Sequence, residues 1–360
     1  QSFILLSLTI CFLSSCTTGP EDPLSKADSN IFVPSYDGLL METLELSADT
    51  SEYSPIRKYA AMEIPENNPI TLEKSALGRQ LFWDERISGD GVRSCYYCHQ
   101  CETGLADDKP KAIGAFEKTL TRNSPTLWNI GYHAQFYWDG RSPSLEAQVL
   151  AAWRGGNMGA DTEEIVKRLN AIRGYKDQFK EVFNEDATSE NVAKALATYM
   201  RLFISDTTPW DRWQEGNESA VNAAAKRGYE LFKRAGCDNC HDGVLFTDLQ
   251  YHNVGIGMDI EEPDLGRFKV TQNDKDRGAF KTPTLRDIRQ SAPYFHDGSV
   301  ATLEEAVDIM LGGGKDNSYL DRTNLKKFKL SSSEKQDLME FLLSLEQPCG
   351  LYEPLLPPED

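Results

Sequence analysis

Histidine is scarce in this chain, with only five in 360 residues. Positive charge is also in short supply, because 38 lysines and arginines face 56 aspartates and glutamates and leave a net charge of -18. Such a surface disfavours binding to nucleic acid and to anionic membranes. It favours a basic partner such as a small electron-carrier protein, although an acidic surface that is merely solvated explains the charge equally well.

Long apolar runs are missing as well, and no internal stretch is a candidate for a transmembrane helix. The one apolar run, residues 3–13, is too short to span a bilayer and has the length of a signal-peptide core. It ends in Leu-Ser-Ser-Cys, which resembles a bacterial lipobox with Cys16 as the lipidated residue. We therefore expect a lipoprotein-type signal peptide over residues 1–16, without its basic start, and a tether over residues 17–60. These features predict a periplasmic lipoprotein anchored to the outer membrane.

The alternation of apolar and polar residues that is typical of strands is absent, whereas helical periodicity recurs. We expect helices over residues 71–83, from Asp161 to a stop at Gly174, from Ser189, from Ser219 to Gly236, from Thr302, and over residues 333–345. Pro, Asp, Gly and Asn cluster at residues 207–219 and predict a linker. The chain is long enough for two domains, which we place at 61–212 and 213–350, followed by a tail at 351–360.

The pattern C-x-x-C-H occurs twice, at residues 95–99 and 237–241. Two thiols at this spacing can form thioethers to one porphyrin, and the adjacent imidazole can bind its iron. A zinc or redox C-x-x-C is the alternative, but a zinc ribbon needs both cysteine pairs on one metal, and here each pair has its own histidine. The sequence therefore predicts two covalently bound c-type haems. The ligand residues are Cys95, Cys98 and His99 for the first haem, and Cys237, Cys240 and His241 for the second.

The same order of features occurs in both halves, namely a helix, the C-x-x-C-H motif, a loop-rich middle and a closing helix. This is the plan of a c-type cytochrome. We therefore predict a mainly α fold with two tandem cytochrome c-like domains. Of the eight cysteines, Cys11 is removed with the signal peptide, Cys16 takes the lipid, and four bind haem. Cys101 and Cys349 remain, either as a disulfide of an exported protein or as two free thiols.

Several longer motifs occur along the chain. They are Arg-Asn-Ser-Pro-Thr at 122–126, Phe-Tyr-Trp-Asp-Gly-Arg at 136–141, Leu-Glu-Ala-Gln at 145–148, Asp-Leu-Gly-Arg at 264–267, Phe-Lys-Thr-Pro-Thr-Leu-Arg at 280–286, and Ala-Pro-Tyr-Phe-His-Asp-Gly at 292–298. Together they resemble the motifs of the bacterial di-haem cytochrome c peroxidases and the related MauG-type oxidases. The resemblance runs in order from about residue 69 to residue 345.

The resemblance implies roles for several further residues. By this resemblance the second haem is the site of electron entry, and Met310 matches the methionine that is its second axial ligand. MauG-type oxidases have tyrosine at that position. Without the motif, Met310 would be interpreted as a core-packing residue. Trp138 matches the tryptophan between the haems, a candidate electron relay whose alternative is a buried aromatic. Gln148 matches a distal-pocket glutamine. Asn123, with the carbonyls of Ser291 and Pro293, matches a calcium site between the domains.

Two departures concern the first haem, the expected peroxide site. The family's distal histidine aligns with Ala115, and no histidine lies between His99 and His133. We therefore expect the sixth position of the first haem to be open or water-bound in the oxidised protein. The alternative is that Lys109, Lys111, Lys118 or Met158 fills it. The family's catalytic glutamate aligns with Asn157, and an amide cannot move the proton that O–O cleavage requires.

We therefore expect a di-haem peroxidase that reduces hydrogen peroxide with electrons from a c-type cytochrome or a cupredoxin. A MauG-like oxidase of a protein or organic substrate and a non-catalytic electron-transfer or peroxide-sensing protein are the alternatives. The sequence leaves the identity of the donor open, and also whether the chain forms a homodimer.

Overall fold

The structure is a computed structural model, and it describes residues 62–359, which all belong to one compact unit, Val33–Asp360. The predicted signal peptide, the lipidated Cys16 and the tether lie outside the described residues. Among the residues that are described, no helix is long and apolar enough to cross a membrane.

The first hydrophobic core is built by five helices. These are α2 (Leu72–Trp83), α4 (Leu145–Arg154), α5 (Thr162–Ala171), α6 (Arg173–Phe183) and α7 (Ser189–Met200). In α2, Gly78 allows a close crossing with α7, because a Cβ at this position would lie 2.0 Å from the carbonyl oxygen of Ala195. Phe82 of α2 packs edge-on against Tyr199 of α7 and against Phe203.

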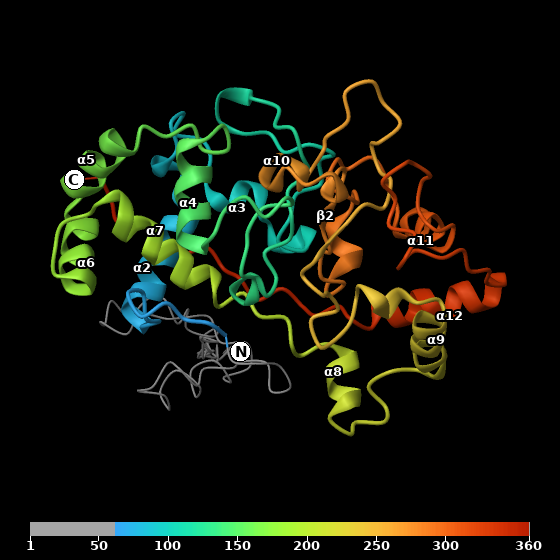
Figure 1. Cartoon of the computed structure of the whole chain (residues 1–360). Helices are drawn as coiled ribbons and strands as arrows, with labels where there is room; N and C mark the ends of the chain where they lie inside the picture. The colour runs from blue at the N-terminus through green and yellow to red at the C-terminus, as the bar shows by residue number, and fades with distance from the viewer. Residues whose placement is uncertain (1–61, 360) are drawn as a thin grey trace, which may run out of the picture. The chain divides into compact units, whose positions relative to one another are not determined.

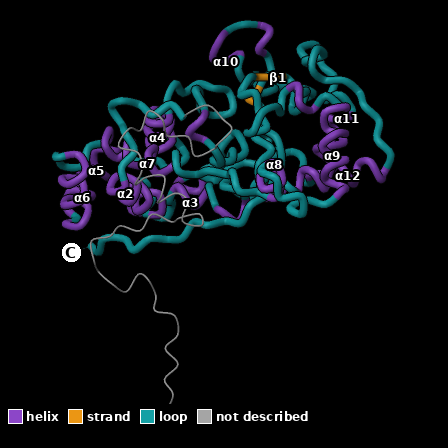
Figure 2. The backbone as a smooth tube through the Cα atoms, turned by 90° about the horizontal axis from the view of Figure 1, so that it is seen from below, coloured by secondary structure: helices purple, strands orange, loops and turns teal. Residues whose placement is uncertain are grey.

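The second core is built by α8 (Pro209–Gln214), α9 (Ala223–Arg234), α11 (Leu303–Leu311) and α12 (Ser332–Leu343). Helices α9 and α12 cross as α2 and α7 do, since a Cβ on Gly228 would lie 2.0 Å from the carbonyl oxygen of Asp337. Figures 1 and 2 show the helices of the first core at one end of this unit and α9, α11 and α12 at the other.

The remaining elements are short. Two further α-helices are α3 (Cys95–Cys98) and α10 (Phe268–Thr271). The 3-10 turns are η2 (Glu85–Ile87), η3 (Cys101–Thr103), η4 (Ala115–Glu117), η5 (Ile130–Tyr132), η6 (Cys237–Asn239), η7 (Asp274–Asp276) and η8 (Ile288–Ser291). Strands β1 (Tyr251–His252) and β2 (Phe280–Lys281) pair antiparallel, with Tyr251 opposite Lys281. The prediction of a mainly α fold is confirmed.

The loops between the helices repeat the same local structure in the two halves. Asn129 and Asp287 both adopt a positive φ, and their backbone N–H groups donate to the carbonyls of Phe203 and Leu345, just beyond α7 and α12. Tyr137 and Phe295 also both have a positive φ, at matching places in the Tyr-Trp-Asp-Gly and Phe-His-Asp-Gly sequences. The two halves therefore share a conformation as well as an order of elements.

Three predicted boundaries differ from the structure. Gly174 does not end a helix; α5 ends at Ala171 and Gly174 lies in the first turn of α6. Helix α9 begins after the cap Asn222 and not at Ser219, because the Asn222 side chain accepts the N–H of Ala225. The predicted linker contains α8, capped by Thr208 with Asp211.

The two cores exchange segments of chain near the predicted domain boundaries, which stay predictions. Trp210 of α8 packs in the second core, and Leu351, after α12, packs in the first. Cys101 and Cys349 form a disulfide, which settles the alternative that the sequence left open. The C-terminal segment then runs back to α5 and α6, where Pro357 lies against Gly174 (Figure 1).

Candidate haem sites

The two C-x-x-C-H motifs hold their histidines in the same way. His99 Nδ1 lies 2.9 Å from the carbonyl oxygen of Leu105, and His241 Nδ1 lies 3.0 Å from that of Phe246. Leu105 and Phe246 both have a positive φ. An Nδ1–H that donates to a carbonyl fixes the tautomer and leaves Nε2 with its lone pair toward a metal.

The protonation states also suit haem attachment. Burial lowers the pKa of His99 to about 4 and lowers the pKa of His241, so both rings are neutral, as an iron ligand must be. The four motif cysteines are free thiols, and burial raises the pKa of Cys95, Cys98 and Cys237 to about 12. Neutral thiols next to a fixed imidazole are the groups from which thioether attachment proceeds, so the residues present fit two c-type haems.

A large apolar cavity adjoins the second motif. Cys237, Cys240 and His241 line it, and Met310 lines it from α11. Leu303, Ala306, Val307 and Leu311 line the same cavity, at the helical spacing that puts them with Met310 on one face of α11. The structure therefore brings the predicted axial methionine and its histidine to one cavity.

Trp138 connects this cavity to the first half of the chain. Its ring lines the cavity of the second motif, while its Nε1–H donates to the carbonyl oxygen of Asn123 at 2.9 Å. Its own carbonyl accepts the N–H of Lys281 at 2.8 Å. These bonds hold Trp138 from both sides, between residues of the first half and the cavity of the second motif.

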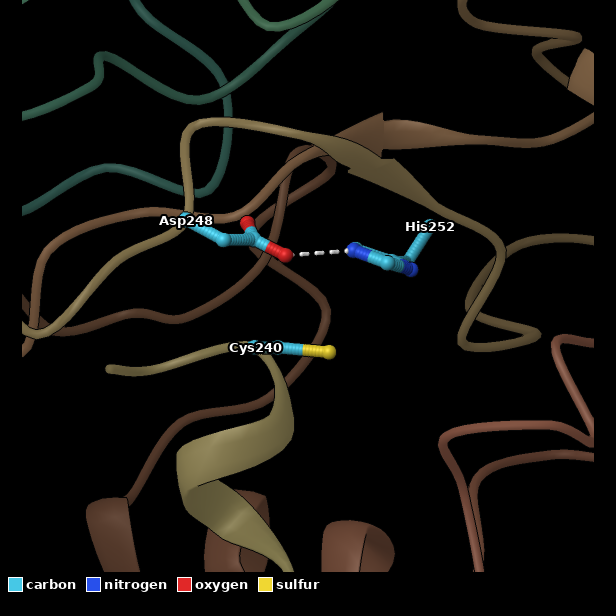
Figure 3. A group of neighbouring side chains, drawn as sticks. All are labelled: Cys240, Asp248 and His252. Carbon is cyan, nitrogen blue, oxygen red and sulfur yellow. Dashed lines mark hydrogen bonds and ion pairs between the residues drawn. The ribbon is translucent and has the colours of Figure 1, made fainter.

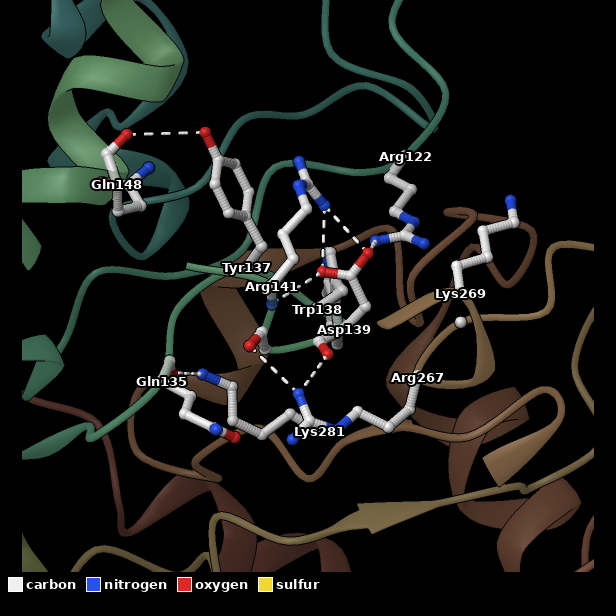
Figure 4. A network of polar contacts seen from close by, with 12 residues as sticks. Arg122, Gln135, Tyr137, Trp138, Asp139, Arg141, Gln148, Arg267, Lys269 and Lys281 are labelled. Carbon is white, nitrogen blue, oxygen red and sulfur yellow. Dashed lines mark hydrogen bonds and ion pairs between the residues drawn. The ribbon is translucent and has the colours of Figure 1, made fainter. Parts of the chain in front are cut away.

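A polar network surrounds Trp138 (Figure 4). Arg122 donates to Asp139 at 2.7 Å and to Asp264 at 2.7 Å, and Arg267 donates to the carbonyl oxygen of Asp139 at 2.9 Å. Burial tends to raise the pKa of the Asp264 carboxyl, but the Arg122 and Lys269 hydrogen bonds outweigh it and hold that pKa well below its usual range. Arg122, Asp139, Asp264 and Arg267 all lie in the sequence motifs, whereas Lys269 does not, and sequence reasoning assigned none of them a role around Trp138.

The distal residues expected at the first haem lie in two loops that contact each other. The backbone N–H of Ala115 in η4 donates to the carbonyl oxygen of Asn157 at 3.0 Å, in the loop after α4. Ala115 is buried and Asn157 is half-buried. Gln148 lies on α4, and its backbone carbonyl accepts the hydroxyl of Tyr137 at 3.5 Å (Figure 4). Among the candidate sixth ligands, Lys111 and Lys118 are exposed, Lys109 pairs with Asp108, and Met158 is buried.

Asp90 is a carboxylate of this region that sequence reasoning missed. Its Oδ2 accepts the N–H of Phe116 at 2.8 Å, and its Oδ1 accepts the hydroxyl of Ser88 at 2.9 Å. Although burial opposes it, these and other hydrogen bonds lower the pKa of Asp90. Asp90 is therefore ionised and holds the η4 turn, and no motif spacing in the sequence could have indicated this.

The three other histidines have different surroundings. His133 Nδ1 lies 3.2 Å from Lys281 Nζ, and His296 stacks on Phe280 and lines the cavity of the second motif. His252 lies between two carboxylates, 2.9 Å from Asp248 and 2.7 Å from Asp321. Asp248, His252 and Cys240 are close enough to hold a metal ion (Figure 3). Haem attachment uses Cys240, however, so this trio is better explained as a haem site with a carboxylate-bound histidine beside it.

The residues expected at calcium are placed near the boundary of the halves. Asn123 is buried; its backbone N–H donates to the carbonyl of His296 at 2.8 Å and its side-chain amide donates to the carbonyl of Lys109 at 2.9 Å. Ser291 ends η8, and its hydroxyl donates to the carbonyl of Ile288. Pro293 follows Ala292 through a cis peptide bond.

Comparisons with known proteins show the family to which the chain belongs. Residues 72–219 match the family model of the di-haem cytochrome c peroxidases. The chain is 38% identical over 308 residues to the methylamine utilization protein MauG of Methylorubrum extorquens, covering 84% of this chain and 86% of that protein. It is 36% identical over 347 residues to the cytochrome-c peroxidase IdrP1 of Denitromonas iodatirespirans, covering 86% of this chain and 92% of that protein.

Among solved structures, the chain is similar to a MauG-like protein associated with microbial copper homeostasis. The TM-score is 0.75 at 31% sequence identity, and the match covers 83% of this chain and 95% of that one. The relatives thus carry both peroxidase and MauG names.

Proposed function

Because the chain belongs to the family of di-haem cytochrome c peroxidases and MauG proteins, with two c-type haems as its cofactors, we propose that it reduces hydrogen peroxide to water. The two electrons would come from a soluble donor such as a c-type cytochrome or a cupredoxin. The observation that carries this proposal is Met310, which lines the same cavity as His241. A methionine ligand raises the potential of a haem, which suits a site that accepts electrons from a mild donor.

The bound haems supply the redox chemistry at both sites. The chain contributes His99 and His241 as neutral ligands, each oriented by a backbone carbonyl. Trp138 lines the cavity of the second motif and is hydrogen-bonded to Asn123 of the first half of the chain. It is therefore the residue best placed to conduct electrons between the two haem sites.

Proton transfer at the first haem site is the step that the residues of the chain are least suited to catalyse. Asn157 cannot carry a proton, and the nearby Asp90 has a lowered pKa and already accepts hydrogen bonds, which makes it a poor general acid at neutral pH. The loss of general acid–base catalysis slows a reaction by roughly 10²–10⁴-fold. We therefore expect slow turnover, with the proton carried by an ordered water that Gln148 or Arg154 positions.

Two other functions have support of their own. The MauG relative and the MauG-like structure favour an oxidase of a protein or organic substrate. Asn157 favours an electron-transfer or peroxide-sensing protein without catalysis. A steady-state assay with peroxide and reduced cytochrome c separates the three. Turnover supports the peroxidase, oxidation by peroxide without donor turnover supports the oxidase, and inertness supports the non-catalytic protein.

We further propose one calcium ion at Asn123 and the carbonyls of Ser291 and Pro293, which are the oxygen ligands that calcium prefers. Chelation should slow transfer from donor to peroxide while both haem spectra stay largely intact, because the ion would order the region around Trp138. Unchanged turnover in protein that elemental analysis shows to be free of calcium would refute the site.

The proposed location is the periplasm, with a lipid anchor at Cys16. C-type haem is attached outside the cytoplasm, and the disulfide between Cys101 and Cys349 suits an oxidising compartment. Metabolic labelling with a fatty acid, compared between the full chain and Cys16→Ser, tests the anchor.

A further inference from the structure

The segment between α11 and α12 is basic, although the chain as a whole carries a net charge of -18. Residues 311–330 contain five lysines and arginines and two aspartates, and no acidic residue occurs from 322 to 333. Both aspartates are already engaged, since Asp316 pairs with Arg322 and Asp321 pairs with His252. The segment therefore presents an excess of positive charge that its own carboxylates do not neutralise.

Three lysines of this segment are held at the surface. Lys326, Lys327 and Lys329 are exposed, whereas Phe328 between them is half-buried. The backbone N–H of Phe328 donates to the carbonyl oxygen of Leu311 at 2.9 Å, which fastens the segment to the end of α11. The ring of Phe328 thus anchors the chain, and the lysines on either side of it project into solvent.

These lysines adjoin the cavity of the second haem motif. Lys326 lines that cavity and is itself exposed, so the cavity reaches the surface beside it. Ala235 and Gly236, just after α9, line the cavity too. The guanidinium of Arg234, the last residue of α9, lies 5.9 Å from the ring centre of Phe328. We call the four side chains beside this opening the basic rim, namely Arg234, Lys326, Lys327 and Lys329.

Helix geometry and simple solvation do not account for the basic rim. A cation at a helix C-terminus complements the helix dipole, which explains Arg234, but residues 326–329 lie outside every α-helix of the described chain. The chain has 56 carboxylate side chains to pair with, yet within residues 62–359 none forms an ion pair with a residue of the basic rim. Neighbouring like charges repel one another, and a partner of opposite charge would relieve this repulsion.

We propose that the basic rim is the docking surface of the electron donor, and that the donor presents an acidic patch to it. The proposal rests on the proposed entry of electrons at the second haem. It reverses the expectation from the net charge, which favours a basic donor. Charges more than about 8 Å apart are largely screened at physiological ionic strength, so the local charge beside the cavity governs docking. The rim would steer an acidic donor toward the cavity and raise its association rate.

The test is stopped-flow oxidation of the reduced second haem by two oxidised carrier proteins. Plastocyanin is an acidic cupredoxin and mitochondrial cytochrome c is a basic cytochrome, and each accepts one electron from the haem iron. We expect the rate constant for plastocyanin to fall as the salt concentration rises, because salt screens an attraction, and that for cytochrome c to rise. The sign of each salt dependence does not depend on the driving force of the reaction.

The variant with Lys326→Gln, Lys327→Gln and Lys329→Gln together removes most of the charge of the rim. Its rate constant with plastocyanin should be about tenfold lower than that of the wild type at low salt, and the salt dependence should become weak. If intact mass shows that this variant does not carry both haems, Lys329→Gln alone decides, with an expected fall of about twofold.

The matched control removes three exposed lysines from α5 and α6, through Lys167→Gln, Lys176→Gln and Lys180→Gln. It changes the net charge equally and should leave the rate constant with plastocyanin close to the wild-type value. The proposal is overturned if this control slows plastocyanin as much as the rim variant does. It is also overturned if the rate constant for cytochrome c falls with rising salt, since a basic partner then docks.

Two further outcomes separate this proposal from others. If the wild type binds phosphatidylglycerol vesicles, the rim variant does not, and both react equally fast with plastocyanin, then the basic rim serves a membrane surface and the proposal is overturned. Electron exchange at the second haem requires no peroxide. A protein that reacts with plastocyanin as expected but does not turn over peroxide therefore supports the docking surface and refutes the proposed peroxidase function.

Discussion

At the scale of single residues, substitution of Met310 is the most direct test of the proposed ligation of the second haem iron. If its thioether binds the second iron, Met310→Leu and Met310→His should lower the potential of that haem and slow electron entry, because a sulfur ligand raises the potential relative to nitrogen or water. Redox titration of each haem measures this effect. Two haems of equal, low potential in the wild-type protein would contradict the assignment.

Ala115 predicts the resting state of the first haem. With no histidine at this position, the iron should be open or water-bound in the oxidised protein and should bind cyanide without prior reduction. Electron paramagnetic resonance of the oxidised protein should show one high-spin and one low-spin ferric signal. Ala115→His should remove the high-spin signal and impose a need for reductive activation. Two low-spin signals in the wild type would show that another side chain fills the site.

The amide at Asn157, in place of a carboxylate, predicts slow turnover of bound peroxide. Asn157→Glu should raise peroxide turnover by up to about 10²-fold, because a carboxylate can move the proton that the amide cannot. Asn157→Gln, which adds length but no acid, is the matched control and should leave turnover near the wild-type value. Equal turnover in all three proteins would mean that the proton takes another route.

The sequence predicts the role of residues that belong to a motif of fixed spacing. It does not predict the role of residues whose partners are distant in the sequence and come into contact only when the chain folds. Two C-x-x-C-H motifs indicate their haems because attachment needs those atoms in that order. Arg93 and Asp90 belong to no such motif, since their partners Glu117 and Phe116 are 24 and 26 residues away in the sequence. Only the folded chain shows that they meet.

At the scale of elements, the helices that pack on a core were predictable and their ends were less so. In α12 the periodicity follows from burial of one face, whereas α2 and α7 are buried on nearly all sides. Gly174 was expected to end a helix, but a kink at Ile172 begins α6 at once, and Pro357 packs on the glycine. That contact comes from the C-terminal segment, which no local pattern reveals.

His252, which pairs with Asp321 in the segment between α11 and α12, gives a prediction of how the stability of the fold changes with pH. The hydrogen bond with Asp248, followed by contacts with Cys240 and Asp321, raises the pKa of His252 to about 11. Haem attachment removes the Cys240 contribution and leaves the two carboxylates. Because the folded-state pKa lies above the unfolded value of about 6.5, the stability from His252 is complete below pH 6.5 and is lost as the pH rises toward the folded-state pKa.

His252→Gln should therefore flatten the decline of stability in the alkaline range, as measured by denaturant unfolding of the di-haem protein at a series of pH values. Asp321→Asn is the matched variant; it removes one of the two carboxylates and should flatten the decline only in part. An unaltered pH profile in His252→Gln would show that the imidazolium does not stabilise the fold.

At the scale of the whole molecule, the disulfide ties the end of the chain to the first haem region. It joins residues 248 positions apart, and beyond it Arg79 donates to the carbonyl oxygen of Tyr352 at 2.5 Å. Cross-links of long loops stabilise proteins by about 2–4 kcal/mol. Cys101→Ser, Cys349→Ser and the double variant should each lose about that much in denaturant unfolding.

The double variant is the internal control for this prediction. If the bond alone is responsible, removing both cysteines costs the same as removing either one, because each change opens the same loop. Losses that add up would show that the cysteines stabilise the fold separately, and unchanged stability in all three would contradict the prediction.

The disulfide also constrains the order in which the protein can be assembled. Cys101 emerges together with Cys95 and Cys98, whereas its partner Cys349 is made 248 residues later. During that interval three thiols lie within seven residues, and any bond between Cys101 and a motif cysteine would block attachment of the first haem. Productive maturation thus requires that Cys101 stay reduced or pair with Cys349, and that it form no bond with Cys95 or Cys98 before haem has taken up those two thiols.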